Sequence, residues 1–381
     1  MNFEFSEDQE MLRQEARKFL SEQCPPETVR GVLDSEATHD EKLWQSIVEM
    51  GWTATALPEA YGGFGMGYLE LCVIAEELGR AVAPVPFSSA VYLAGESLLA
   101  AGSDAQKSEW LPKLASGEAI GTLALAETPG AVTARKIRAK VENGKLTGTK
   151  TPVPDGSIVD YAVVAAKDAQ GVSLYLADLS DAGVTRETLA TVDPARNAAT
   201  LTFDDVPVEP LGQPGKGLEY LERVLDRAAV LVAFEQLGGA QVALEIGVAY
   251  AKERFAFGRP IGSFQAIKHR LAEMFVSLEL ARSNTYFGAW ALSTGADELP
   301  VAAATARVAA SQAFYECARE NTQVHGGMGF TWEGDCHLYY RRAKLLNLIL
   351  GGERVWKEKL IQRLQARREP DATTATTLNA A

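Results

Sequence analysis

The sequence AKVENGKLTG, residues 139–148, carries a strong local signal of strand structure. Two short runs flank Asn143-Gly144, a dipeptide that favours the tight turn of a β-hairpin. Four further short runs between turn signals surround it: GTLALAE (121–127), DYAVVAA (160–166), VSLYLADL (172–179) and AATLTFDDV (198–206). Five or more short strands in about 95 residues predict a small β domain over 119–214, either a sandwich or a barrel.

On both sides of this β segment the apolar residues recur at helical spacing. Before it, FSEDQEMLRQEARKFL (5–20) and LELCVIAEELGRAV (69–82) predict helices, with Ser6 as an N-cap, in an α-helical domain over 1–118. After it, helical segments near 216–254, 264–295, 299–322 and 335–368 predict a four-helix bundle over 215–368. The fold class is therefore α+β, and the last residues, 369–381, have no apolar face and are predicted to be disordered.

The composition excludes several classes of function. The 381 residues include 50 acidic and 37 basic side chains, a net charge of −13, which disfavours nucleic acid as a partner. No run approaches the roughly 20 apolar residues of a membrane span, and the acidic start does not resemble a signal peptide, so we expect a cytoplasmic protein. Four scattered cysteines and four histidines without ligand spacing predict neither disulfides nor a metal site.

Three separated motifs make the sequence resemble the acyl-CoA dehydrogenase family of flavoproteins. They are LPEAYGGFGMG (57–67), ERFAFGRPIGSFQAIKHRLAEM (253–274) and QVHGGMGFTWEGDCHLYYRRAK (323–344), in the family's order and at its distances. The resemblance covers residues 3–368. It implies FAD as cofactor, an acyl-CoA as substrate, dehydrogenation to the trans-2-enoyl-CoA, and an electron-transfer flavoprotein as electron acceptor.

The resemblance also implies which residues touch FAD. In the family, the arginine and phenylalanine of RFAFG reach across a subunit interface to the pyrophosphate and adenine half of a neighbour's FAD, and QVHGG makes a second adenosine contact. The implied contacts here are Arg254, Phe257, Gln265, Gln323, Gly326 and Gly327. A planar guanidinium suits phosphate, and glycines allow close backbone approach. Alone, RxxFG would equally fit a surface arginine beside a core phenylalanine.

The family's catalytic base is missing at both positions where members carry it. That base is a glutamate, which removes the α-proton of the acyl group. Counting from QVHGG places the usual position at Leu350, and counting back from RFAFG places the alternative position at Ala228. Asp226 and Glu235 lie nearby on the same helix and are weak candidates. Asp226 equally fits a partner for an arginine, and Glu235 a buried hydrogen bond.

The expected contacts to the flavin ring and to CoA are also eroded. The family's Thr-Glu-Pro-Gly-Ala-Gly-Ser-Asp loop, which covers the flavin, reads AETPGAVTA (126–134) here. The hydroxyl that the family places near flavin N5 matches Pro154, which has neither a hydroxyl nor an amide donor. The arginine expected to hold CoA matches Ala229, although Arg227 is adjacent.

These losses and retentions together indicate one subunit of a complex of unlike chains. A sister chain would supply the base and the flavin pocket of a heterotetramer, although a homotetramer stays open. The segment 330–344 resembles small subunits that handle bulky acyl-CoAs, of steroid side-chain or dicarboxylic type. Two alternatives remain, a reduced-flavin monooxygenase of the same fold and a non-catalytic scaffolding subunit.

Overall fold

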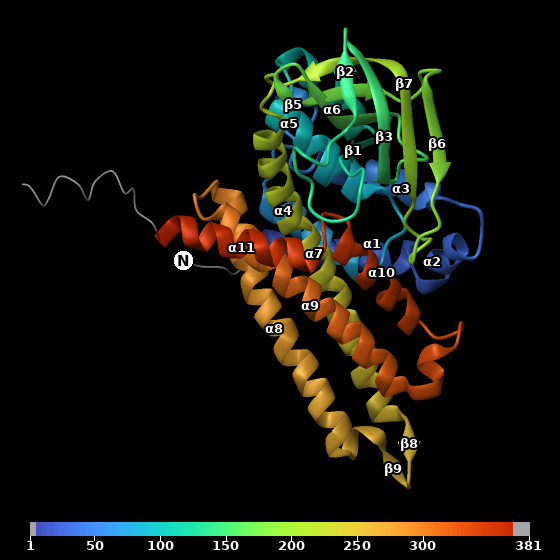
Figure 1. Ribbon diagram of the computed structural model, residues 1–381. Coiled ribbons are helices and arrows are strands. Elements are labelled where there is room, and N and C mark those ends of the chain that lie inside the picture. Colours follow the sequence, from blue (N-terminus) through green and yellow to red (C-terminus); the bar gives the residue numbers. More distant parts are fainter. Residues whose placement is uncertain (1–4, 369–381) are drawn as a thin grey trace, which may run out of the picture.

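The computed structural model describes residues 5–368, and the order of elements along the chain is helical, then β, then helical (Figure 1). The first part comprises α1 (Glu7–Gln23), α2 (Pro26–Leu33), α3 (Glu41–Glu49), η1 (Trp52–Ala54), η2 (Glu59–Tyr61), α4 (Tyr68–Arg80), the π-helix η3 (Ser88–Gly95), α5 (Glu96–Ala101) and α6 (Asp104–Ala115). The predicted N-cap Ser6 is confirmed, because its hydroxyl accepts the Gln9 amide and the Gln9 side chain accepts the Ser6 amide. The predicted tail, 369–381, lies outside the described residues.

Seven strands form the middle part of the chain. They are β1 (Gly121–Ala124), β2 (Lys140–Glu142), β3 (Lys145–Pro154), β4 (Tyr161–Asp168), β5 (Gly171–Asp178), β6 (Val184–Thr188) and β7 (Ala198–Leu211). The path β4–β2–β3–β7–β5 closes because β5 also pairs with β4, so the predicted β domain is a barrel. β2 and β3 form the predicted hairpin, with Asn143 at φ +53° and Gly144 at φ +76°.

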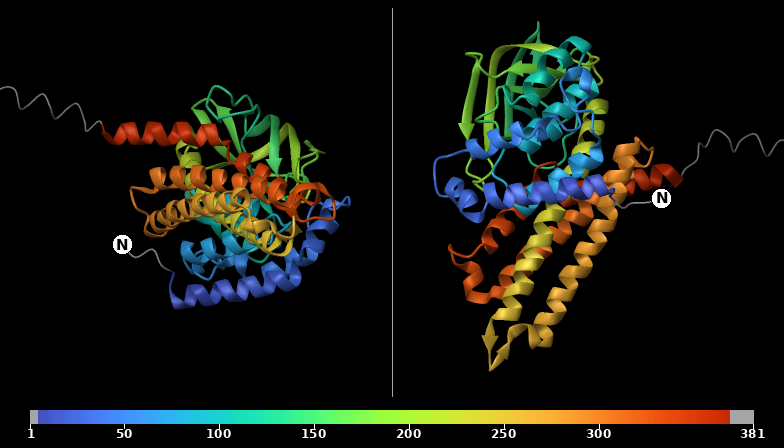
Figure 2. Two further views of the ribbon diagram at one scale, coloured as in Figure 1. Left: turned by 90° about the horizontal axis from the view of Figure 1, so that it is seen from below. Right: turned by 180° about the vertical axis from the view of Figure 1, so that it is seen from behind.

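The last part consists of α7 (Gly217–Glu253), the short hairpin of β8 (Phe255–Ala256) and β9 (Arg259–Pro260), η4 (Ile261–Ser263), α8 (Gln265–Thr294), α9 (Leu299–His325), η5 (Gly326–Phe330), α10 (Cys336–Leu348) and α11 (Glu353–Arg368). The helices α7, α8 and α9 run alongside one another and away from the barrel (Figures 1 and 2). The predicted fourth segment, 335–368, is two helices rather than one. The chain breaks at Gly351, whose φ of +91° no helix can continue.

The helix α7 is the central element of the molecule and packs very closely against α4. A Cβ on Gly79 would lie 1.9 Å from the Glu235 carbonyl oxygen, and a Cβ on Gly238 would lie 1.9 Å from that of Glu76. By length and apolarity α7 could also cross a membrane, but 78% of its most apolar window is buried inside the protein. That burial is expected of a core helix.

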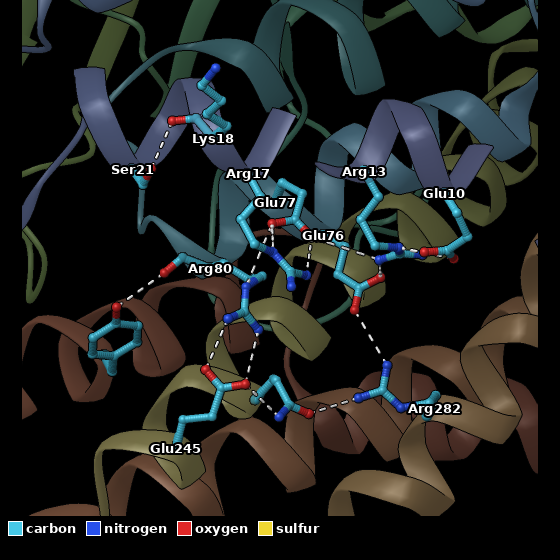
Figure 3. A network of polar contacts seen from close by, with 12 residues as sticks. Glu10, Arg13, Arg17, Lys18, Ser21, Glu76, Glu77, Arg80, Glu245 and Arg282 are labelled. Carbon is cyan, nitrogen blue, oxygen red and sulfur yellow. Dashed lines mark hydrogen bonds and ion pairs between the residues drawn. The ribbon is translucent and has the colours of Figure 1, made fainter. Parts of the chain in front are cut away.

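A network of ion pairs fixes α1 to the helices beneath it (Figure 3). Arg13 bonds Glu76 at 2.5 Å, Arg17 bonds Glu77 at 2.7 Å, and Arg282 of α8 lies 3.4 Å from Glu76. Arg13 and both glutamates are buried, so each charge needs its partner. Removing one member of a buried pair typically costs about 3–5 kcal/mol. The network therefore holds the first helix in place across α4 and α8.

Candidate functional site

Arg254 and Phe257 lie in the hairpin at the far end of the long helices, remote from the barrel (Figure 1). Arg254 ends α7, where its amide donates to the Tyr250 carbonyl at 2.8 Å and its carbonyl accepts from the Ile261 amide at 2.7 Å. Phe257 and Gly258 form the tight turn, both with positive φ, +53° and +76°. The hairpin backbone is thus fixed at its base and its tip.

Arg254, Phe255 and Phe257 are exposed on this hairpin. Phe257 is 96% exposed, so it is not the core phenylalanine that RxxFG would equally fit. Within residues 5–368 the Arg254 guanidinium makes no hydrogen bond or ion pair. A non-glycine residue in left-handed conformation with an almost fully exposed aromatic ring is unusual, and it indicates a surface made for contact with something outside this chain.

The same end of the molecule as the hairpin also carries Gln265, Gln323 and the pair Gly326 and Gly327. Gln265 is the first residue of α8, and Gln323 lies in the last turn of α9. The Tyr250 ring stacks on the His325 ring with centroids 4.0 Å apart, which ties the end of α9 to the end of α7. All six predicted FAD contacts are exposed.

The backbone at the end of α9 is open to an approaching group. No atom lies within 4 Å of a Cβ built on Gly326 or Gly327, and Gly326 has φ +58°. Beside it, Gln323 lines a pocket of about 320 Å³ whose wall includes Phe330, Trp332 and Arg341. This end of the molecule combines an unpaired guanidinium, an exposed ring, an amide side chain and uncovered glycine backbone.

The eroded loop at 126–134 is tied to the barrel by a buried ion pair. The Glu127 carboxylate accepts from Lys150 Nζ at 2.6 Å and from the amides of Arg138 and Ala139 at 2.7 and 3.1 Å. Burial lowers the pKa of Lys150. Burial alone would raise the pKa of Glu127, but the hydrogen bond and the charge of Lys150 lower the pKa of Glu127 overall. The polar groups of Glu127 are thus used within the chain.

The position expected near flavin N5 offers no hydrogen-bond donor. Pro154 ends β3, and its carbonyl accepts from the Thr122 hydroxyl at 2.7 Å. Asp155, directly after it, has φ +52° and is buried. Its carboxylate accepts from Ser89 at 2.5 Å and is therefore turned toward the helices.

Both weak candidates for the base are buried and face arginines. Asp226 bonds Arg363 of α11 at 2.9 Å, and burial raises the pKa of Asp226 to about 6 against the charges of Arg363 and Lys359. Glu235 Oε1 lies 3.6 Å from Arg196, and burial raises the pKa of Glu235 against that charge. For Asp226 the arginine partner is the one that the sequence reading allowed. For Glu235 the buried hydrogen bond is replaced by an ion pair.

The helix face that carries Ala228 and Ala229 has a third buried acid nearby, which sequence reasoning missed. Glu96 of α5 bonds Arg227 at 3.0 Å and the Tyr68 hydroxyl at 2.8 Å, and burial raises the pKa of Glu96. Arg227 is thus paired with Glu96 of α5 in this chain. The signal was visible, since Glu96 is an isolated acid within an apolar run, 85–101.

The cysteines and histidines build no further site. Cys24, Cys72, Cys317 and Cys336 are all buried free thiols. Across residues 5–368, no three side chains of His, Cys, Asp or Glu are grouped so that they could hold a metal ion.

Comparison with known proteins identifies the family. A model of the acyl-CoA dehydrogenase N-terminal domain matches residues 6–118, and one of the C-terminal domain matches residues 215–365. The acyl-CoA dehydrogenase IpdE2 of Mycobacterium tuberculosis is 35% identical over 339 residues, 88% of this chain and 91% of that protein.

Solved structures give the same result. A chain of the ChsE4–ChsE5 complex from Mycobacterium tuberculosis is 29% identical with a TM-score of 0.87, covering 98% of this chain and 100% of that one. A chain of a Tcur3481–Tcur3483 steroid ACAD variant is 32% identical with a TM-score of 0.86, covering 95% and 99%. This chain therefore belongs to the acyl-CoA dehydrogenase family, whose members are FAD-dependent oxidoreductases.

Proposed function

We propose that this chain is one subunit of a heteromeric acyl-CoA dehydrogenase, in which a sister chain carries the catalytic glutamate and most of the flavin pocket. One observation carries the proposal: the groups that reach outward are intact and exposed, while the inward positions hold Ala228, Leu350 and Pro154. A chain that lacks the residues of its own reaction centre but keeps the outward FAD contacts is suited to complete the site of a neighbouring subunit.

The outward groups fit the ADP half of an FAD held by the sister chain. The unpaired Arg254 guanidinium matches phosphate oxygens. The exposed Phe257 ring offers a face for adenine, and Gly326 and Gly327 let a pyrophosphate approach the backbone. Gln323 adds an exposed amide with both a donor and an acceptor.

The inward groups do not fit the flavin ring or the reaction. Pro154 has no hydrogen-bond donor, and the Glu127 carboxylate already accepts hydrogen bonds from Lys150 and two backbone amides. Asp226 and Glu235 each form an ion pair with an arginine. The arginine charge favours the ionised carboxylate, but the ion pair also holds that carboxylate in place within the chain. When bound, FAD accepts the β-hydride as a carboxylate removes the α-proton. This chain places no free carboxylate at either family position for that proton.

The substrate we propose is a bulky acyl-CoA of the steroid side-chain type, converted to its trans-2-enoyl-CoA, with an electron-transfer flavoprotein as acceptor. The support is similarity to subunits of a steroid ACAD and of the two-protein ChsE4–ChsE5 complex. A dicarboxylic acyl-CoA is the competing substrate that the assay must include.

The test is turnover by the chain alone and by the chain co-purified with a sister acyl-CoA dehydrogenase chain. Each preparation receives a steroid side-chain acyl-CoA, a dicarboxylic acyl-CoA and an artificial electron acceptor, and mass spectrometry detects the loss of two hydrogens. We expect product from the pair only. Equal turnover by the chain alone would contradict the subunit role, and a hydroxylated product with reduced flavin and oxygen would instead indicate a monooxygenase. A pair as inactive as each chain alone would indicate a scaffold.

A further inference from the structure

The segment 331–335 links η5 to α10, and an arginine of α2 binds it from the side. The Arg30 guanidinium donates to the carbonyl of Trp332 and, at 3.1 Å, to the carbonyl of Glu333. It also pairs with the Asp335 carboxylate at 2.7 Å. Arg30 lies 302 positions before Trp332 along the chain, yet α2 lies beside the start of α10 in the fold (Figure 1). The first helical part of the chain is thus bonded directly to this segment of the last part.

These contacts depend on the shape of a guanidinium. Its planar set of five N–H donors can reach two carbonyls and a carboxylate at once, whereas the ammonium group of a lysine is a single point charge. The two carbonyls belong to turn residues outside any helix or strand. The Arg30 side chain is only 18% exposed, so its bonds are largely shielded from water. Arg30 therefore fixes the path of the backbone through 332 and 333.

The Trp332 ring is held by three further contacts. Its Nε1 donates to Asp34 Oδ1 at 3.2 Å, at the end of α2. The His337 ring stacks on it, with centroids 4.7 Å apart and planes inclined by 14°. The Arg341 guanidinium lies 5.4 Å from the centroid of the same ring. Trp332 is nevertheless 47% exposed, so the ring is fixed in orientation without being buried.

The residues held in this way line the pocket beside the predicted adenosine contact. The pocket of about 320 Å³ is lined by Gln323 and also by Trp332 and His337. The Nε2 atom of His337 lies 3.3 Å from a nitrogen of the Arg30 guanidinium and 3.1 Å from the Trp332 carbonyl oxygen. Two lining residues of the pocket are therefore in direct contact with Arg30, although Arg30 itself is not part of the pocket lining.

The open glycine backbone and this part of the pocket belong to one continuous stretch, 323–337. Near its beginning the stretch is packed on α9, because a Cβ on Gly329 would lie 2.5 Å from the Thr322 carbonyl oxygen. Further along, the bonds from α2 hold it. Gly326 and Gly327, with no atom within 4 Å of a Cβ built on either, are thus carried on a stretch that is fixed on both sides of the pocket.

We propose that Arg30 is a positioning residue for the ADP half of the neighbour's FAD. It acts through the segment 331–335, which it holds in the conformation that lines the pocket before the cofactor arrives. The inference rests on the proposed function, which brings that cofactor to Gln323. A segment that is already ordered loses less conformational entropy on binding, so removal of the guanidinium lowers the fraction of chains that are ready to bind FAD.

The first experiment measures FAD affinity in the complex with a sister acyl-CoA dehydrogenase chain. If only about one chain in ten keeps the segment ordered after Arg30→Met, the Kd for FAD rises roughly tenfold. Arg30→Lys should give an intermediate Kd, because lysine can pair with Asp335 but cannot span both carbonyls. A lower melting temperature with an unchanged Kd would mean that Arg30 only stabilises the fold, and it would overturn the positioning role.

Arg17→Met is the matched control for the loss of an arginine from the first helical part. Arg17 of α1 bonds Glu77 of α4 at 3.0 and 2.7 Å. Its removal should lower the melting temperature and leave the Kd for FAD unchanged. An equal rise of the Kd in Arg17→Met and Arg30→Met would show a general effect of destabilisation and would contradict a specific role of Arg30.

The second experiment needs no cofactor and uses the free chain. Hydrogen exchange followed by mass spectrometry compares the amides of 328–337 with those of the hairpin 254–260. We expect Arg30→Met to speed exchange in 328–337 and to leave the hairpin unchanged, because only the first peptide is bonded to α2 through Arg30. Equal exchange of 328–337 in the variant and the unsubstituted chain would overturn the inference.

Arg254→Ala in the same binding assay separates this inference from the proposed function. A Kd raised by Arg254→Ala but not by Arg30→Met would overturn the positioning role alone, whereas no change in either variant would overturn the proposed function. If Arg30→Met does not assemble with the sister chain, Asp34→Ala removes the acceptor of the Trp332 indole at an exposed position. We then expect a Kd roughly threefold higher, and an unchanged Kd would overturn the role of the held ring.

Discussion

The Arg254→Ala variant tests whether this chain holds a neighbour's cofactor. Arg254 is exposed, and its guanidinium makes no hydrogen bond or ion pair within residues 5–368, so its loss should change the free energy of unfolding by no more than about 0.5 kcal/mol. A hydrogen bond from a charged group to phosphate contributes about 1.5–3 kcal/mol. Binding of FAD to the assembled complex should therefore weaken, with its Kd rising roughly 10- to 100-fold.

The assay follows flavin absorbance of the complex after dilution and gel filtration, with the melting temperature recorded in parallel. Arg223→Ala is the matched control, because Arg223 is an exposed arginine at the opposite end of the same helix, α7. We expect flavin loss with Arg254→Ala alone and unchanged melting for the free chains. Equal flavin retention in the two variants would refute the interface role of Arg254.

Three further predictions concern stability and the missing base. Gly238→Ala should lower the free energy of unfolding by about 3 kcal/mol in chemical denaturation, because its Cβ would lie 1.9 Å from the Glu76 carbonyl oxygen. Gly31→Ala is the control and should not destabilise the chain, because no atom lies within 4 Å of its Cβ. Equal denaturation midpoints of the two variants would contradict the close packing of α4 and α7. The pKa of Asp226 rises from 3.8 to about 6 on folding, so the folded state binds the proton more tightly. The free energy of unfolding should therefore fall by about 2 kcal/mol as pH rises from 4 to 6, and Asp226→Asn should remove this slope. Leu350→Glu restores a carboxylate at the counted position, yet the chain purified alone should stay inactive because its flavin contacts are still missing; turnover would show that the base was the only loss.

Much of the fold could be predicted because its signals are local. The Asn143-Gly144 turn and the long 3.6-residue periodicities depend on neighbours within a few positions, and the structure confirms them. The segment 335–368 was predicted as one helix although it contains Gly351 and Gly352, because the helical periodicity continues on both sides of the break. The choice between sandwich and barrel depends on which strands meet, which no local pattern specifies.

The buried ion pairs of Arg196 with Asp155 and Glu235 could not be predicted from the sequence. Asp155, Arg196 and Glu235 lie far apart along the chain, in a strand end, a connection and a helix, and only the packed structure brings them together. The sequence places Asp226 and Glu235 near Ala228, but it does not show that an arginine faces each of them in the folded chain. The exposure of Phe257 likewise depends on how the hairpin leaves α7.

The most direct measurement of the central claim is the flavin-to-chain ratio, taken from visible absorbance of the chain purified alone and after co-expression with a sister acyl-CoA dehydrogenase chain. If this chain completes a neighbour's site, it should carry little flavin alone, and the complex should carry about one flavin per unlike pair. A ratio near one for the chain alone would contradict this account and identify a self-sufficient homo-oligomer.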